Sequence, residues 1–195
     1  MALSLSKGQK ISLEKTAGNT LSRVIMGLGW DAKKTGGFFG FFQQDQAIDL
    51  DATCVLFDAR GEVVDTVWFK QLQSKDGSIV HTGDNRTGAG DGDDEQINVD
   101  LSRIPSGVQN LVFVVNSFTG QSFDQIQNAF CRLVDSTTDK EIARFELSGG
   151  GTHTAQVMVR LYRDGGAWQM HAIGEKTSGR TYQELLPAIK PHLGA

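Results

Sequence analysis

Short apolar segments separated by turn residues recur along almost the whole chain. In Val24–Trp30 and Ile97–Leu101 every second side chain is apolar, which is the period of a strand with one buried face. Val108–Asn116 is apolar almost without interruption, and this predicts a central strand that is covered on both faces. Ala155–Arg163 and Ala167–Ile173 flank a glycine turn and form the clearest predicted hairpin. With about ten such segments, the chain is predicted to be an all-β sandwich of two mostly antiparallel sheets with short peripheral helices.

Two short helices and an edge strand complete the predicted architecture. Ser122–Gln125 and Thr181–Glu184 have the spacing of a capping box, and Pro187 is expected to cut or kink the second helix. Leu3–Leu13 alternates weakly, which predicts an edge strand or a hairpin arm. No linker, composition shift or internal repeat divides the 195 residues, so we expect a single domain over residues 1–195.

The charge and the cysteines of the chain argue against several classes of protein. A formal net charge of −4 and a pI near 5.5, without a cluster of Lys or Arg, argue against nucleic acid as a partner. The N-terminus lacks the apolar run of a signal peptide, and the longest apolar run, Leu111–Val115, is far too short to span a membrane. Cys54 and Cys131 lie in apolar, strand-like segments, which predicts buried free thiols. We therefore expect a cytoplasmic protein.

The whole formal net charge of −4 lies in one glycine-rich stretch, His81–Glu95, and the residues just after it. Between Asp84 and Asp100 there are six carboxylates and one arginine, a local charge of −5. Carboxylates this close repel one another, and a bound cation relieves that repulsion. Oxygen ligands without a nearby cysteine favour calcium over zinc. Arg86 and Ala89 stand where an EF-hand needs an oxygen ligand and a glycine, so the stretch is not an EF-hand. A solvated acidic loop without an ion remains the alternative.

Further carboxylates are expected to lie near this stretch. Asp31 falls at the exit of the strand that contains Val24–Trp30. Asp49 and Asp51 share one face of the predicted strand Ile48–Phe57, about 7 Å apart. A cation would relieve the repulsion between them, although a strand end that faces water is the alternative.

The alternation of Ile97–Leu101 also ranks the acidic residues within the loop. Extended backwards, it places Asp93 and Glu95 on the core side of the strand and Asp94 on the outer side, unless Gly92 resets the phase. We therefore rank Asp91, Asp93 and Glu95 above Asp94 as ligands.

An aromatic glycine-rich segment, Lys33–Phe42, has neither helical nor strand period. It is either tucked over the core or held ready for a partner, and exposed apolar patches are uncommon on soluble monomers. Because it leaves the strand that ends at Asp31 and returns near Asp49, it is expected to lie beside the ions. Calcium could then present its aromatic side chains to a membrane surface or a protein partner, with the two lysines favouring anionic headgroups. These side chains are Phe38, Phe39, Phe41 and Phe42.

Three motifs together resemble the TerD-domain family of bacterial tellurium-resistance and stress proteins. They are Gly27-Leu-Gly-Trp-Asp31, Asp49-Leu-Asp51 and the acidic stretch His81–Glu95. The Phe/Gly segment, Val67-Trp-Phe69 and Asn116–Phe123 look most like the TerZ branch of that family.

The resemblance implies a calcium-binding β-sandwich that supports resistance to tellurite and other chemical stress and has no known enzymatic activity. It implies two calcium ions and partners among the other tellurium-resistance proteins, one of them embedded in a membrane. The protein would then be cytoplasmic or peripheral at the inner membrane face. Ala89 stands where the family usually has Glu. The ligands that the resemblance carries over to this sequence are Asp31, Asp49, Asp51, Asp84, Asn85, Asp91, Asp93 and Glu95.

Two enzyme readings compete with a metal-sensing or scaffold module. A metal-dependent hydrolase could use the clustered carboxylates, but calcium activates water poorly compared with zinc. Reduction of tellurite by Cys54 and Cys131 is disfavoured, because both thiols are expected to be buried and neither has a CxxC partner. We expect a binding module and not an enzyme.

Overall fold

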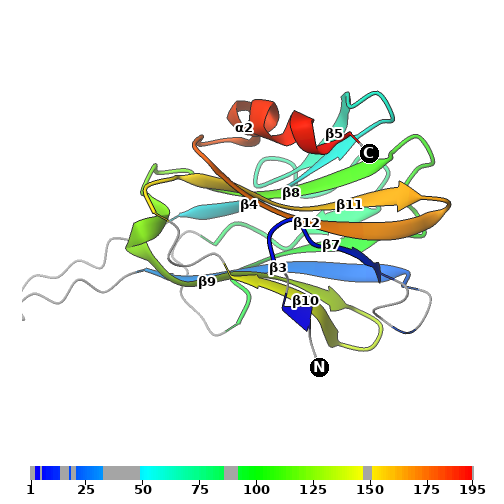
Figure 1. Cartoon of the computed structure of the whole chain (residues 1–195), viewed down its shortest axis with the longest axis horizontal. Coiled ribbons are helices and arrows are strands. Elements are labelled where there is room, and N and C mark those ends of the chain that lie inside the picture. The colour runs from blue at the N-terminus through cyan, green and yellow to red at the C-terminus, as the bar shows by residue number, and fades with distance from the viewer. Residues whose placement is uncertain are drawn as a thin grey trace, which may run out of the picture.

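The computed structural model describes residues 3–4, 6–13, 18, 21–32, 49–85, 92–146 and 151–194. In these residues two six-stranded sheets face each other (Figure 1), and every strand pair is antiparallel except β1 with β10. The first sheet has the order β1 (Leu3–Ser4), β10 (Lys140–Glu146), β9 (Ile126–Asp135), β3 (Arg23–Ala32), β7 (Glu95–Asp100) and β6 (Ile79–His81). The second has the order β2 (Lys10–Ser12), β12 (Ala167–Thr177), β11 (Ala155–Asp164), β8 (Asn110–Ser117), β4 (Leu50–Phe57) and β5 (Val63–Val67). The predicted all-β sandwich is confirmed.

The main core lies between the two sheets and follows the predicted alternation. Met26 and Leu28 of β3, Ile97 of β7, and Leu111 and Phe113 of β8 are all buried in it. On β7 the burial alternates residue by residue along the whole strand. Every second side chain of these strands therefore faces the core between the sheets, as the two-residue period predicts.

A second apolar cluster lies on the outer face of the second sheet, under helix α2 (Tyr182–Ile189) (Figure 1). Leu185 and Ile189 of the helix are fully buried in this cluster together with Val55 and Val112 of β4 and β8. Both strands are consequently buried at every residue. The continuous apolar run of β8 was expected to be covered on both faces, and this is confirmed.

The chain begins with edge strands in both sheets. β1 lies at one edge of the first sheet and β2 at one edge of the second, and between them Gly8 donates its N–H to the carbonyl of Ala172 in β12. Gly8 has a φ of +83°, which glycine adopts without a steric penalty. The predicted edge strand is therefore two short ones, in opposite sheets.

The two predicted helices are present, but Pro187 does not cut the second. A 3₁₀ turn, η1, spans Phe123–Gln125, and α2 continues through Pro187 to Ile189 before a further 3₁₀ turn, η2 (Lys190–His192). A proline removes only one helical hydrogen bond, and the burial of Ile189 beyond it holds the last turn in place. None of the described helices has the length and apolarity needed to cross a membrane.

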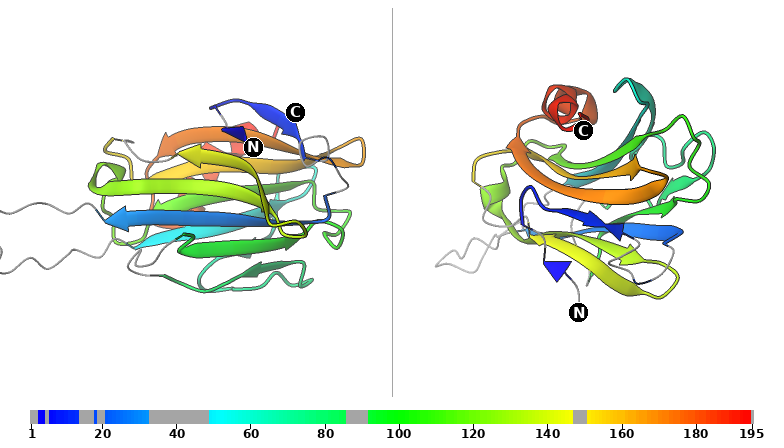
Figure 2. Two further views of the ribbon diagram at one scale, coloured as in Figure 1. Left: turned by 90° about the horizontal axis from the view of Figure 1, so that it is seen from below. Right: turned by 45° about the vertical axis from the view of Figure 1, so that its right-hand side comes forward.

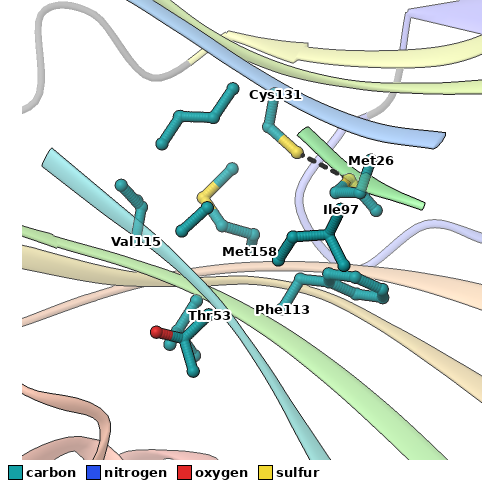
Figure 3. A pocket seen from close by; sticks show the side chains of 10 residues that line it. Met26, Thr53, Ile97, Phe113, Val115, Cys131 and Met158 are labelled. Carbon is teal, nitrogen blue, oxygen red and sulfur yellow. Dashed lines mark hydrogen bonds between the residues drawn. The ribbon is translucent and has the colours of Figure 1, made fainter. Parts of the chain in front are cut away.

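Both cysteines are buried free thiols, as predicted. Cys131 points into the core between the sheets, where its Sγ lies 3.0 Å from Sδ of Met26 (Figure 3). The side chains of Cys131 and Met26 line a cavity of about 10 Å³, together with Met158. Burial raises the pKa of each thiol far above its ordinary value, so neither is a reactive thiolate in the folded protein.

Candidate metal centre

Three carboxylates converge at one end of the sandwich. Asp49 directly precedes β4, Asp51 is the second residue of β4, and Asp84 follows β6. One oxygen from each lies within 4.8 Å of the others. Asp51 is buried and Asp84 is exposed, so the group opens toward solvent on one side. Figures 1 and 2 show that β3 ends and β4 begins at this same end of the molecule.

Glu95, the first residue of β7, connects this group to the other sheet. Its side chain is buried, and its Oε2 accepts a hydrogen bond of 2.7 Å from the N–H of Ala52. Its Oε1 accepts a bond of 3.1 Å from the N–H of Asn85. His81 lies on the other side, with Nε2 3.4 Å from Oε2 of Glu95 and Nδ1 accepting a bond from the N–H of Gly83. Glu95 therefore orders the backbone on both sides of the three carboxylates.

Burial and neighbouring negative charges disfavour the ionised form of Asp51. Its burial, and then the charges of Asp49, Glu95 and Asp84, raise the pKa of Asp51 to about 8. A hydrogen bond of 3.0 Å from Nδ2 of Asn116 opposes this shift and orients Oδ2 of Asp51. A divalent cation between these oxygens would reverse the repulsion and favour the ionised form. The donor set, which is oxygen from carboxylates, is the one that calcium and magnesium prefer.

Asp31 and Asp94 lie beside this group. Oδ2 of Asp94 accepts a bond of 2.8 Å from the N–H of Trp30, and its Oδ1 accepts one of 3.0 Å from Nδ2 of Asn85. Burial is the main cause that raises the pKa of Asp94, and the charge of Asp31 adds to it. Asp31 is exposed and accepts a bond from Nδ2 of Asn128. From the strand alternation we ranked Asp94 below Asp91, Asp93 and Glu95 as a metal ligand. In the structure, however, Asp94 lies near both Asp31 and Asn85.

Asp93 lies elsewhere, and the register predicted for it is wrong. Its carboxylate lies over Gly27, on the outer face of the first sheet, and not on the core side with Glu95. There it accepts bonds of 2.7 Å and 3.1 Å from Nε and Nη2 of Arg132, and a third from Nε2 of Gln96. β7 begins only at Glu95 and the chain bends at Asp94, so the alternation of the strand does not extend back to Asp93. Arg132 already balances the charge of Asp93, and the three-carboxylate group does not include it.

The remaining predicted residues lie outside the described part of the chain. These are Asp91 among the ligands, Ala89 in the acidic stretch, and the loop residues Phe38, Phe39, Phe41 and Phe42.

Residues 1–186 match the family model described as the TerD domain. The chain belongs to the TerD domain family. Over 184 residues it is 50% identical to the tellurium resistance protein TerZ of Serratia marcescens, covering 94% of each chain. It is also 40% identical to general stress protein 16U of Bacillus subtilis, covering 92% of this chain and 93% of the relative.

Solved structures of the TerD domain show the same fold. A homologue from Streptomyces coelicolor A3(2) superposes with a TM-score of 0.71 at 20% identity, covering 90% of this chain and 99% of that one. The predicted membership of the TerD family, in a TerZ-like form, is confirmed.

In this TerD-domain chain, the sequence did not reveal what the two glycines of Gly27-Leu-Gly-Trp-Asp31 do. A Cβ on Gly27 would come within 2.2 Å of Oδ2 of Asp93, and one on Gly29 within 2.5 Å of the carbonyl of Gly92. The glycines therefore let the end of the acidic stretch pass close over β3. In the sequence, two glycines two residues apart on the outer face of an alternating strand could have indicated that another segment passes close by.

Proposed function

We propose that this TerD-domain protein is a calcium-binding module of a bacterial tellurium-resistance and chemical-stress response, acting as a metal-sensing or scaffold component. The observation that carries the proposal is the convergence of Asp49, Asp51 and Asp84 from two separate segments of the chain. The names of its TerZ-like and stress-protein relatives support the cellular role.

Asp49, Asp51 and Asp84 would hold the first ion. Bound calcium would offset two of the three negative charges of the group, and Glu95 keeps the surrounding backbone in place through its bonds to Ala52 and Asn85. We propose a second ion beside the first, at Asp94, which accepts a hydrogen bond from Asn85 and lies near Asp31. Asp91, Asp93 and Glu95 are the other predicted ligands. Asp93 is the weakest candidate of the described residues because Arg132 engages it, and Asp91 lies outside the described part of the chain.

A binding role is favoured over hydrolysis by the position of His81. Its side chain is almost fully buried, its Nδ1 accepts a bond from Gly83, and its Nε2 faces Glu95. A general base needs to reach the water or substrate whose proton it takes. His81 instead supports the fold of the site.

The partners we propose are other proteins of the tellurium-resistance system, including one embedded in a membrane. The protein would act in the cytoplasm or at the inner face of that membrane. Phe38, Phe39, Phe41 and Phe42 would contribute to docking there when calcium is bound.

Calcium binding can be measured by calorimetric titration of metal-stripped protein with calcium, magnesium and zinc. We expect calcium to bind most tightly, and a hundredfold excess over its Kd to stabilise the fold by about 2.7 kcal/mol, visible as a higher Tm. Asp51→Asn and Asp84→Asn should each weaken binding at least tenfold, since each removes a ligand charge.

A matched control for these variants is Asp139→Asn. Asp139 is exposed in the turn between β9 and β10 with a φ of +54°, which asparagine also tolerates. It should bind calcium like the wild type. If calcium gives neither heat nor a change in Tm, the proposed function is overturned.

A further inference from the structure

A tight turn next to the metal centre carries an aromatic and a cationic residue at its tip. After β5, Trp68 and Gln71 exchange both backbone hydrogen bonds, of 3.0 Å and 2.9 Å. Phe69 and Lys70 are the two residues between them and therefore form the tip. A two-residue turn of this kind holds its side chains in a fixed position.

Four aromatic rings continue from this tip as a connected row. The ring centroids lie 5.4 Å apart between Phe118 and Phe69, 4.8 Å between Phe69 and Trp68, and 5.1 Å between Trp68 and Tyr182. Nζ of Lys70 lies 5.3 Å from the centroids of both Phe69 and Trp68. Phe118 is 40% exposed although it is wholly apolar. We call these five residues the aromatic surface.

Hydrogen bonds attach the aromatic surface to the residues of the metal centre. The N–H of Phe118 donates to the carbonyl of Asp49 at 3.1 Å. Nδ2 of Asn116 donates both to Asp51 and to the carbonyl of Arg180, just ahead of α2, which begins with Tyr182. An ion that orders Asp49 and Asp51 would thus order both ends of the row.

The chemistry of this surface fits an anionic lipid membrane. Trp and Tyr favour the headgroup region, where an apolar ring and a polar N–H or O–H are both satisfied. Phenyl rings are buried at the boundary with the acyl chains, and a lysine beside them attracts anionic lipids. Without an ion, the carboxylates repel such a membrane. Bound calcium would offset two of the three negative charges of the group and so weaken this repulsion, and Asp84 lies on the exposed side of the group, where a membrane can approach.

We propose that the aromatic surface docks into the headgroup region of an anionic membrane when calcium occupies the Asp49, Asp51 and Asp84 group. Phe69 and Phe118 enter the membrane, and Lys70 contacts anionic headgroups. This inference rests on the proposed calcium binding and adds to it a docking surface built only from described residues, separate from Phe38–Phe42.

Vesicle co-sedimentation tests the inference. The full chain is mixed with vesicles of phosphatidylcholine alone or of phosphatidylcholine with phosphatidylserine, each with calcium or with chelator. We expect partitioning only with both phosphatidylserine and calcium, and a loss of about tenfold or more in Phe69→Ser/Phe118→Ser, because two phenyl rings no longer leave water. Lys70→Glu should weaken partitioning on the anionic vesicles.

Val64→Ser is the matched control, because Val64 is exposed to 41%, like Phe118, but lies on β5 outside the aromatic surface. It should partition like the wild type. Calorimetry on each variant separates the two proposals. If the wild type binds calcium but does not sediment with anionic vesicles, or if the double Phe variant sediments equally well, the aromatic surface does not dock to membranes and calcium binding stands. If calcium does not bind at all, the proposed function itself fails.

Discussion

At the acidic end of the sandwich, the carboxylate of Asp51 is costly to ionise. It is buried, while Asp49, Asp84 and Glu95 all raise its pKa further, to about 8. Without metal, the folded protein therefore retains a proton that the unfolded chain releases near its ordinary pKa of 3.8. This group stabilises the fold most below that value, and its contribution is lost as the pH rises to about 8.

In chelator, we expect the free energy of unfolding to fall by up to about 1.4 kcal/mol per pH unit between pH 5 and pH 7 because of Asp51. Urea denaturation at a series of pH values measures this slope. Asp51→Asn, which cannot ionise, should flatten it. An unchanged slope in the variant would assign the pH dependence to other groups.

Gly27 is a second residue whose identity is fixed by its surroundings. Gly27→Ala would push the carboxylate of Asp93 away from Arg132, since the new Cβ falls 2.2 Å from Oδ2. We expect a loss of about 1–3 kcal/mol in urea denaturation, the usual range for overpacking. Gly107→Ala is the control, because nothing lies within 4 Å of a Cβ there. Equal stability of the two variants would contradict the close approach.

The sequence predicted the convergence of some site residues but not of others, for physical reasons. Asp49 and Asp51 are two residues apart on a regular strand, so their shared face follows from local geometry. Asp93 takes its position from Arg132, which is distant in sequence, and from the bend of the backbone at Asp94, ahead of β7. Contacts of that kind depend on which strands become neighbours in the sheet. The alternation of apolar and polar residues along one strand does not predict its neighbours.

Among the elements, the strands themselves were the most predictable part. β3, β7 and the β11–β12 hairpin lie where the apolar pattern predicted them, because the buried face of a strand repeats every two residues. β8, which is buried on both faces, lies where the continuous apolar run predicted it. The order of strands within each sheet was not predicted. β3 lies between β7 and β9, a pairing across long stretches of sequence that only the assembled core selects.

Helix α2 should contribute to stability through one side chain above all. Leu185 is fully buried against the outer face of the second sheet. Leu185→Ala should cost about 2–5 kcal/mol in the free energy of unfolding, through lost burial and the cavity left behind. Leu186 on the same helix is only half-buried, so Leu186→Ala should cost clearly less. Equal losses would mean that α2 does not pack as described.

At the scale of the whole molecule, the sandwich shields both thiols from solvent. Native protein should not react with Ellman's reagent, and both Cys54 and Cys131 should react once the protein is unfolded in urea. Ser106→Cys, which places a thiol at an exposed site, is the positive control and should react at once. Rapid reaction of the native thiols would revive the thiol-based reduction of tellurite.

Glu95 has a consequence for how the two sheets move relative to each other. β5 pairs with β4 only as far as Cys54, and the N–H of Ala52 beyond that point is bonded by a carboxylate from the opposite sheet. A backbone N–H of the second sheet is thus hydrogen-bonded by a side chain of the first sheet. At this point the two sheets are joined by a polar contact as well as by apolar packing. We expect slow breathing of the sandwich to start at the far end of β7, and amide hydrogen exchange at Ala52 to be among the slowest in the protein.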